Sequence, residues 1–175
     1  SSDVLPQIKE FDRVSTTAVN SYVGPMYSDY LGRLGKRLTE LQRNTKGPAA
    51  TMLIMQSNGG VMPLEESRRF PVRAILSGPA GGVSGAAHYG SLVDEHRVIG
   101  LDMGGTSTDI SIVVDGSPHT TGETFEAGWK IAVPIIDVTT LGAGGGSVAS
   151  VDPGGILRVG PESAGADPGP ACYGR

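Results

Sequence analysis

Apolar residues recur with the period of an α-helix through the first 43 residues of the chain. Four leucines illustrate this spacing: Leu31, Leu34, Leu38 and Leu41. The pattern predicts a helix or a pair of helices. A bend is expected near Gly24-Pro25, because proline removes a backbone donor from a helix interior.

The next part of the chain alternates between short apolar runs and turn residues. The run "TMLIM" (51–55) predicts a buried strand, and "QSNGG" (56–60) predicts a turn after it. A brief helix is expected over 64–70. The stretch 77–93 is rich in small residues and predicts a helix, with Pro79 suited to its first turn.

From residue 97 onward the periodicity changes from helix to strand. "RVIGLDM" (97–103) predicts a buried strand, and the alternating stretch 109–116 predicts a second strand that ends at Asp115-Gly116. Residues 129–138 are expected to be extended, with Pro134 at an edge or a bend.

The end of the chain is dominated by turn residues. A hairpin is expected over 148–159, and the last stretch, 160–175, is expected to be nearly all loop. The chain therefore divides into a helix-rich part, 1–96, and a part rich in strands and glycine loops, 97–175. This order of elements predicts an α/β fold.

Composition narrows the functional classes. A net charge of −4 and a pI near 5.3 argue against nucleic acid or an anionic membrane as the main partner. No apolar run is long enough to span a bilayer, and the N-terminus lacks a signal-peptide pattern. The single cysteine, Cys172, excludes an internal disulfide framework and favours the reducing cytoplasm.

The stretch "LDMGGTSTDISIV" (101–113) is the strongest candidate for chemistry. It lacks the Walker pattern, and a strand follows it where a Rossmann loop requires a helix. What remains is a hairpin loop whose bare amides can form an anion-binding nest. Its candidate phosphate-binding residues are Gly104, Gly105, Thr106, Ser107 and Thr108.

Two aspartates flank this loop. Asp102, at the end of a strand, is expected to hold Mg²⁺ through water, and Asp109 to orient the loop or a water molecule. The alternative is a simple tight turn whose hydroxyls cap backbone groups. The paired aspartates favour the phosphate-binding interpretation.

These residues resemble the DxGGTxxD phosphate hairpin of the actin/hexokinase/Hsp70 ATPase superfamily. The wider chain resembles one family within it, hydantoinase A/5-oxoprolinase, of the N-methylhydantoinase A-like large-subunit type. Ordered blocks carry this resemblance: "VLPQIKEFDRVSTTAVNSYVGP", "MQSNGGV", "LSGPAGGV", "LDMGGTSTD", "GAGGGSVA" and "VGPESAGADPGPACYGR". It implies part of an actin-like (ribonuclease H-like) ATPase domain, with a mixed sheet and flanking helices. Family members are longer, so residues 1–175 are expected to be a central fragment, inactive in isolation.

The glycine-rich loop 141–150 has the backbone freedom to lie against a ligand. The resemblance implies that it lines the nucleotide or substrate cleft through Gly144, Gly145, Gly146 and Ser147. A wide turn required by sheet packing is the alternative.

Four further residues are candidates for the substrate cleft: Gln56, Asn58, Asp137 and Asp167. The first two follow a strand, where α/β sheets bind ligands, and an Asn-Gly turn is the equal alternative. The sequence departs from the family at one point. Many family members have an Asp-x-His-Thr run before the glycine loop, and here Asp137 matches that run but Thr139 stands in place of its histidine.

The resemblance implies that the parent protein uses ATP and Mg²⁺ to phosphorylate the carbonyl oxygen of a cyclic amide. It also leaves open the use of another divalent metal by the parent enzyme. Hydantoin, N-methylhydantoin and 5-oxoproline are the implied substrates, and a hydantoinase B-type subunit or domain is the implied partner. Two alternatives stay open: a subunit of an ATP-dependent ketone carboxylase, which the departure at Thr139 makes more plausible, and a non-catalytic scaffold.

Overall fold

The computed structural model describes residues 1–43, 47, 51–165 and 167–174. The chain forms two compact units: Ser1–Gly81 with Thr120–Ile136, and Gly82–His119 with Asp137–Arg175. Helices and antiparallel strand pairs make up both units, so the predicted α/β class is confirmed. None of the helices in this described part of the chain is long and apolar enough to cross a membrane.

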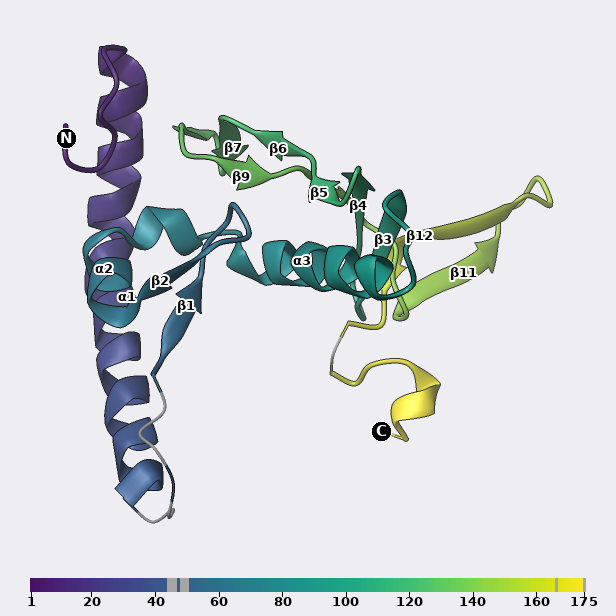
Figure 1. The fold of residues 1–175 in the computed structure, drawn as a ribbon. Helices are drawn as coiled ribbons and strands as arrows, with labels where there is room; N and C mark the ends of the chain where they lie inside the picture. Colours follow the sequence, from purple (N-terminus) through teal and green to yellow (C-terminus); the bar gives the residue numbers. More distant parts are fainter. Residues whose placement is uncertain (44–46, 48–50, 166, 175) are drawn as a thin grey trace. The chain divides into compact units, whose positions relative to one another are not determined.

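The first unit begins with one long helix, α1 (Glu10–Arg43), which runs without interruption through Gly24-Pro25 (Figure 1). The alternative of two helices is therefore wrong. Leu31 is buried, but Leu41 is 64% exposed, so the leucine spacing does not define the buried face.

The remaining elements of this unit are short, and they include the predicted helix over 64–70. They are β1 (Leu53–Met55), β2 (Val61–Pro63), α2 (Leu64–Arg69), the 3₁₀-helix η1 (Pro71–Ala74), β6 (Thr120–Thr121), β7 (Thr124–Glu126), β8 (Trp129–Ile131) and β9 (Ile135–Ile136). Three antiparallel pairs form, β1 with β2, β6 with β9, and β7 with β8. The strand predicted at 51–55 is present but not buried, because Leu53 is exposed and the rest of β1 is half-buried. The core lies elsewhere, in a cluster of Val72, Ile131, Val133 and Ile135.

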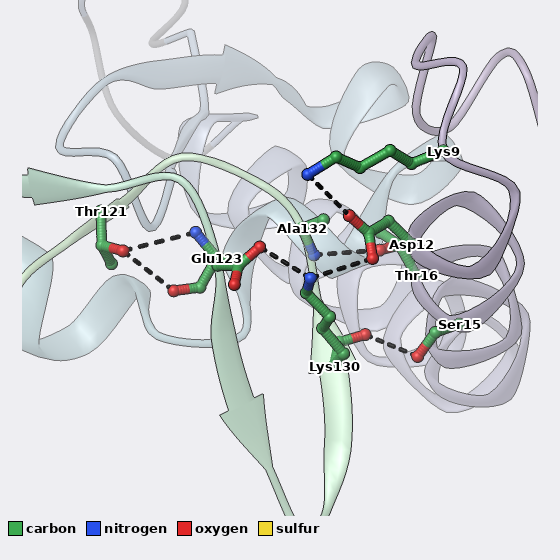
Figure 2. Close-up of polar contacts among 8 residues, drawn as sticks. All are labelled: Lys9, Asp12, Ser15, Thr16, Thr121, Glu123, Lys130 and Ala132. Atoms are coloured by element: carbon green, nitrogen blue, oxygen red, sulfur yellow. Dashed lines mark hydrogen bonds and ion pairs between the residues drawn. The ribbon is translucent and has the colours of Figure 1, made fainter.

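A cluster of polar contacts fastens β8 to the first turns of α1 (Figure 2). The Lys130 ammonium lies 3.0 Å from Asp12 and 2.8 Å from Glu123, and these hydrogen bonds raise the pKa of Lys130, with Glu123 contributing most. The buried Thr16 hydroxyl accepts the Ala132 N–H at 3.0 Å. Buried polar groups require such partners, and here they set where the strand meets the helix.

The second unit contains the remaining strands, and the boundary between the units falls within α3. Its elements are α3 (Ser77–Leu92), β3 (Val98–Met103), β4 (Thr108–Val114), β5 (Ser117–Pro118), β10 (Val138–Leu141), β11 (Ser147–Val151), β12 (Leu157–Ser163) and η2 (Ala171–Tyr173). A four-stranded sheet has the order β10-β4-β3, with β5 also paired to β4. The predicted hairpin is the β11–β12 pair, and its second strand continues to Ser163, into the stretch expected to be loop. All strand pairs among the described residues are antiparallel, whereas the resemblance implies a mixed sheet.

Small residues let α3 lie close to β3. A Cβ added at Gly90 would come within 2.7 Å of both the Glu95 carbonyl oxygen and a Val98 methyl group. A Cβ added at Gly100 would lie 3.7 Å from the Ala86 methyl group, and it would also collide with the Ser111 hydroxyl. Close helix–sheet packing therefore explains the glycine at position 90 and the small side chain of Ala86, but not Gly78 or Gly85, where an added Cβ would meet nothing within 4 Å.

The other face of the same sheet is apolar and open. Side chains alternate along a strand, so Ile99, Leu101 and Met103 share one face of β3. They are 75%, 65% and 61% exposed, and Ile112, which pairs with Ile99, is 54% exposed. The strand predicted over 97–103 is thus confirmed, but its predicted burial is wrong for this face.

Candidate functional site

The candidate site lies in the second unit, where the hairpin formed by β3 and β4 turns. The strands pair antiparallel as far as Met103 and Thr108, and the turn closes when the Gly104 N–H donates to the Ser107 carbonyl at 2.9 Å. "LDMGGTSTD" is therefore a strand–loop–strand element, as predicted.

The register of this hairpin pairs the two flanking aspartates. Asp102 and Asp109 are direct cross-strand partners, so their side chains share one face with Cβ atoms about 5 Å apart. The Thr140 hydroxyl on β10 donates to the Asp109 carboxylate at 2.6 Å and fixes its orientation. Like charges opposite one another destabilise a strand pair unless a cation lies between or beside them.

The second glycine loop, residues 142–146, packs directly against the hairpin. The Gly145 N–H donates to the Gly104 carbonyl at 2.9 Å, and the Gly146 N–H donates to the Gly105 carbonyl at 2.6 Å. A Cβ added at Gly144 would lie 2.7 Å from the Gly104 carbonyl oxygen and 2.8 Å from the Ser107 nitrogen. Glycine is therefore required at 144 for the two loops to meet.

This contact leaves one set of donors free. The amides of Gly105, Thr106 and Ser107 point to no acceptor among the described residues, and neither do the hydroxyls of Thr106 and Ser107. Successive free backbone N–H groups in a turn form a concavity that binds anions. The geometry suits a phosphate group held by the hairpin.

Two other hydroxyls that were predicted to bind phosphate, those of Thr108 and Ser147, make hydrogen bonds within the loops. The Thr108 hydroxyl is buried and donates to the Ala143 carbonyl at 2.6 Å. The Ser147 hydroxyl accepts the Gly144 N–H at 2.9 Å. Like the amides of Gly145 and Gly146, which donate to carbonyls of the hairpin, these groups hold the two loops in place.

The two candidates in the first unit make contacts within their own turn. The Gln56 side chain donates to the Val61 carbonyl at 3.2 Å, and the Asn58 side chain accepts the Gly60 N–H at 2.9 Å. The neighbouring Ser57 is almost fully buried and accepts the Leu76 N–H at 3.1 Å. These contacts give the turn a structural role, and a role in binding stays a prediction.

The remaining candidates, Asp137 and Asp167, are exposed. Asp137 lies 3.1 Å from the Nδ1 atom of His119, a pairing that sequence spacing does not reveal. Thr139, the position of the departure, pairs with Ile110 on β4. Sequence reasoning also missed Tyr173, whose hydroxyl oxygen would be 3.7 Å from a Cβ added at Gly105.

The residues at the hairpin fit Mg²⁺ but not a metal held by protein alone. No group of three or more His, Cys, Asp or Glu side chains gathers anywhere in the described part of the chain. Mg²⁺ is usually bound by one or two carboxylates together with water and substrate phosphates. Asp102 and Asp109 beside a free anion nest match that donor set.

The family model for hydantoinase/oxoprolinase matches residues 13–175. The chain is 42% identical to the caprolactamase subunit alpha of Pseudomonas jessenii over 173 residues, which are 99% of this chain and 24% of that one. It is 43% identical to 5-oxoprolinase 1 of Arabidopsis thaliana over 99% of its own length and 13% of the relative. The chain therefore spans a quarter or less of these relatives.

Two solved structures resemble the fold. The crystal structure of the ATP-dependent caprolactamase matches with a TM-score of 0.77 and 41% identity, over 98% of this chain and 24% of that one. The nucleotide-free structure of acetone carboxylase, from work on ATP-dependent acetone carboxylation, matches with a TM-score of 0.72 and 29% identity, over 94% and 22%.

Proposed function

Because the chain belongs to the hydantoinase/oxoprolinase family, we propose that it is the phosphate-binding segment of an enzyme that hydrolyses a cyclic amide at the expense of ATP. The observation that carries this proposal is the interlocked pair of glycine loops, which leaves three consecutive amides free beside two paired carboxylates. The similarity to caprolactamase and 5-oxoprolinase supports the substrate class.

The chemistry transfers the γ-phosphoryl group of ATP to the carbonyl oxygen of the ring amide. A P–O bond to the amide oxygen forms, the bond to ADP breaks, and the carbonyl carbon becomes a stronger electrophile. One water molecule adds to that carbon and the C–N bond breaks, with the nitrogen taking a proton. A second water molecule releases phosphate from the acyl phosphate, which leaves the ring-opened carboxylate.

This chain supplies positioning and charge rather than a nucleophile. The amides of Gly105, Thr106 and Ser107 hold the transferred phosphoryl group where negative charge is spread over its oxygens. Asp102 and Asp109 would hold Mg²⁺, which would supply neutralisation of the phosphate charge. We propose a hydantoinase B-type partner subunit, which is supported by the name of the similar caprolactamase chain, a subunit alpha. We also propose a cytoplasmic setting, which is supported by the single cysteine of the sequence.

A ketone carboxylase is the second candidate. It is favoured by the structural similarity to acetone carboxylase and by Thr139 in place of the family histidine. In this reaction the phosphoryl acceptor is an enol or bicarbonate, so turnover requires bicarbonate.

The decisive experiment measures phosphate release by the full-length protein with its partner subunit. The substrates are 5-oxoproline, caprolactam, hydantoin, N-methylhydantoin and acetone, each with and without bicarbonate. Release coupled to ring opening and indifferent to bicarbonate supports the amidase, and release that needs ketone and bicarbonate supports the carboxylase.

Two variants test the site itself. Asp102→Asn removes one of the paired carboxylates and is expected to lower phosphate release at least a hundredfold. Asp115→Asn is the matched control, because Asp115 is an exposed aspartate at the opposite end of β4, in a positive-φ turn that asparagine also adopts. If Asp102→Asn and Asp115→Asn are equally active, the hairpin is only a turn and the chain is a scaffold.

A further inference from the structure

The C-terminal segment brings one tyrosine to the phosphate hairpin. Tyr173 ends the short helix η2, and its hydroxyl oxygen would lie 3.7 Å from a Cβ added at Gly105. Gly105 is the first of the three residues with free amides. The phenol therefore lies beside the anion nest, although 68 residues separate Tyr173 from Gly105 in the chain.

Three backbone hydrogen bonds lead from the hairpin to Gly169, which directly precedes the turn that holds this tyrosine. Gly146 donates to the Gly105 carbonyl at 2.6 Å, and Ala164 donates to the Gly146 carbonyl at 2.7 Å. Gly169 then donates to the Ala164 carbonyl at 3.1 Å, and Tyr173 closes the turn of η2 with a 2.9 Å bond. The position of the phenol is thus coupled to the same glycine loop that shapes the nest.

The hydroxyl of Tyr173 makes no contact that the fold requires. Its residue is 52% exposed, and the hydroxyl has no hydrogen-bond partner among the described residues. The phenol can therefore donate a hydrogen bond to a ligand without losing a contact within the chain. Here the donor is left free at the edge of a set of other free donors.

We propose that the Tyr173 hydroxyl donates a hydrogen bond to the terminal phosphoryl group of the nucleotide held by the hairpin amides. This inference rests on the proposed function, since it assigns one more contact to the same phosphate site. Tyr173 is thereby a binding residue, supplied by the C-terminal "PACYG" segment rather than by either glycine loop.

The test uses the full-length protein and compares Tyr173→Phe with Tyr30→Phe. Tyr30, on α1, is 53% exposed and also has no hydroxyl partner among the described residues, so it matches Tyr173 in both respects. Affinities for ATP and for AMP are measured by calorimetry with Mg²⁺, together with the thermal midpoint of each variant. A hydrogen bond to a charged group in a half-exposed site predicts about a fivefold to tenfold loss of ATP affinity in Tyr173→Phe. AMP affinity and the thermal midpoint are expected to stay at wild-type values, as is everything measured for Tyr30→Phe.

The outcomes separate the two proposals. If the wild-type protein binds ATP and Tyr173→Phe binds it equally well, the inference is overturned and the proposed function stands. If Tyr173→Phe loses ATP and AMP affinity to the same extent, the hydroxyl does not contact the terminal phosphoryl group, and the inference is again overturned. A wild-type protein that binds no nucleotide overturns both.

Discussion

Adding one methyl group at Gly144 tests whether the two glycine loops form one site. The Cβ of Gly144→Ala would lie 2.7 Å from the Gly104 carbonyl oxygen and 2.9 Å from the Thr106 carbonyl carbon. Ordinary van der Waals contact begins at 3.4 Å, and every obstructing atom belongs to the hairpin backbone. The hairpin must therefore move by about 0.7 Å, since backbone cannot rotate away as a flexible side chain does.

The expected magnitude follows from that displacement. Overpacking of this kind costs about 1–3 kcal/mol in the free energy of unfolding. A shift approaching 1 Å in a phosphate site lowers the rate of phosphoryl transfer by roughly tenfold to a hundredfold. The hydrogen bond from Thr108 to Ala143 is expected to lengthen with the same movement.

Gly142→Ala is the matched control, because a Cβ at Gly142 meets no atom within 4 Å and lies in the same loop. Phosphate release, ATP affinity and the thermal midpoint are measured for both variants in the full-length protein. If Gly144→Ala stays within twofold of Gly142→Ala in phosphate release and ATP affinity, the two loops are not locked together and do not form one phosphate site.

Three further predictions concern stability and are read from denaturation curves followed by circular dichroism. Gly90→Ala is expected to lower the free energy of unfolding by about 1–2 kcal/mol, because the added Cβ would lie 2.7 Å from the Glu95 carbonyl oxygen. Gly85→Ala is the control, because an added Cβ there meets nothing within 4 Å, and it is expected to raise the free energy of unfolding by about 0.5–1 kcal/mol. The pKa of Lys130 is raised above 10.5 by its hydrogen bonds to Glu123 and then Asp12, so its contribution to stability is complete below pH 10.5 and is lost as the pH rises through the folded value. Lys130→Met is expected to abolish that alkaline loss of stability, and an unchanged profile shows that these two ion pairs do not stabilise the fold. The pKa of Asp152 is lowered from 3.8, chiefly by the hydrogen bond from the backbone N–H of Ile156. Its contribution to stability is therefore complete above pH 3.8 and is lost as the pH falls through the folded value. Asp152→Asn is expected to remove this acid dependence of stability, and a variant that keeps it shows that other carboxylates are responsible.

Local elements were predictable from local signals. The small-residue helix α3, the short helix α2 and the β11–β12 hairpin all appear where proline, glycine and periodicity indicated. The long helix α1 is an exception, because Pro25 suggested a bend. The loss of one backbone donor is compensated on the far side of Pro25, where Leu31 is buried and the Tyr27 hydroxyl bonds to Ser67 at 2.7 Å.

Contacts between distant residues were not predictable in the same way. The hairpin turn at Gly104 and the loop at Gly144 were each predicted as a glycine-rich binding loop, but no pattern in either one identifies the other as its partner. Burial on β3 also escaped prediction. Apolar alternation indicates a face that is covered in the finished protein, and the chain spans only a quarter of the caprolactamase subunit, so the covering residues need not lie within 1–175.

The cross-strand pairing of Asp102 and Asp109 gives the strongest reason to regard the hairpin as more than a turn. A tight turn needs glycine, but it gains nothing from two carboxylates on the same face of the ladder, where their repulsion opposes pairing. Thr140 holds one of the carboxylates at 2.6 Å instead of letting it rotate away, so the pair is maintained by a specific contact. Under the proposed function, a cation accompanied by phosphate would reverse the sign of that interaction, and the free amides of Gly105 and its two neighbours would receive the phosphate. The register that is unfavourable in an empty hairpin would thus become favourable on binding of a magnesium nucleotide.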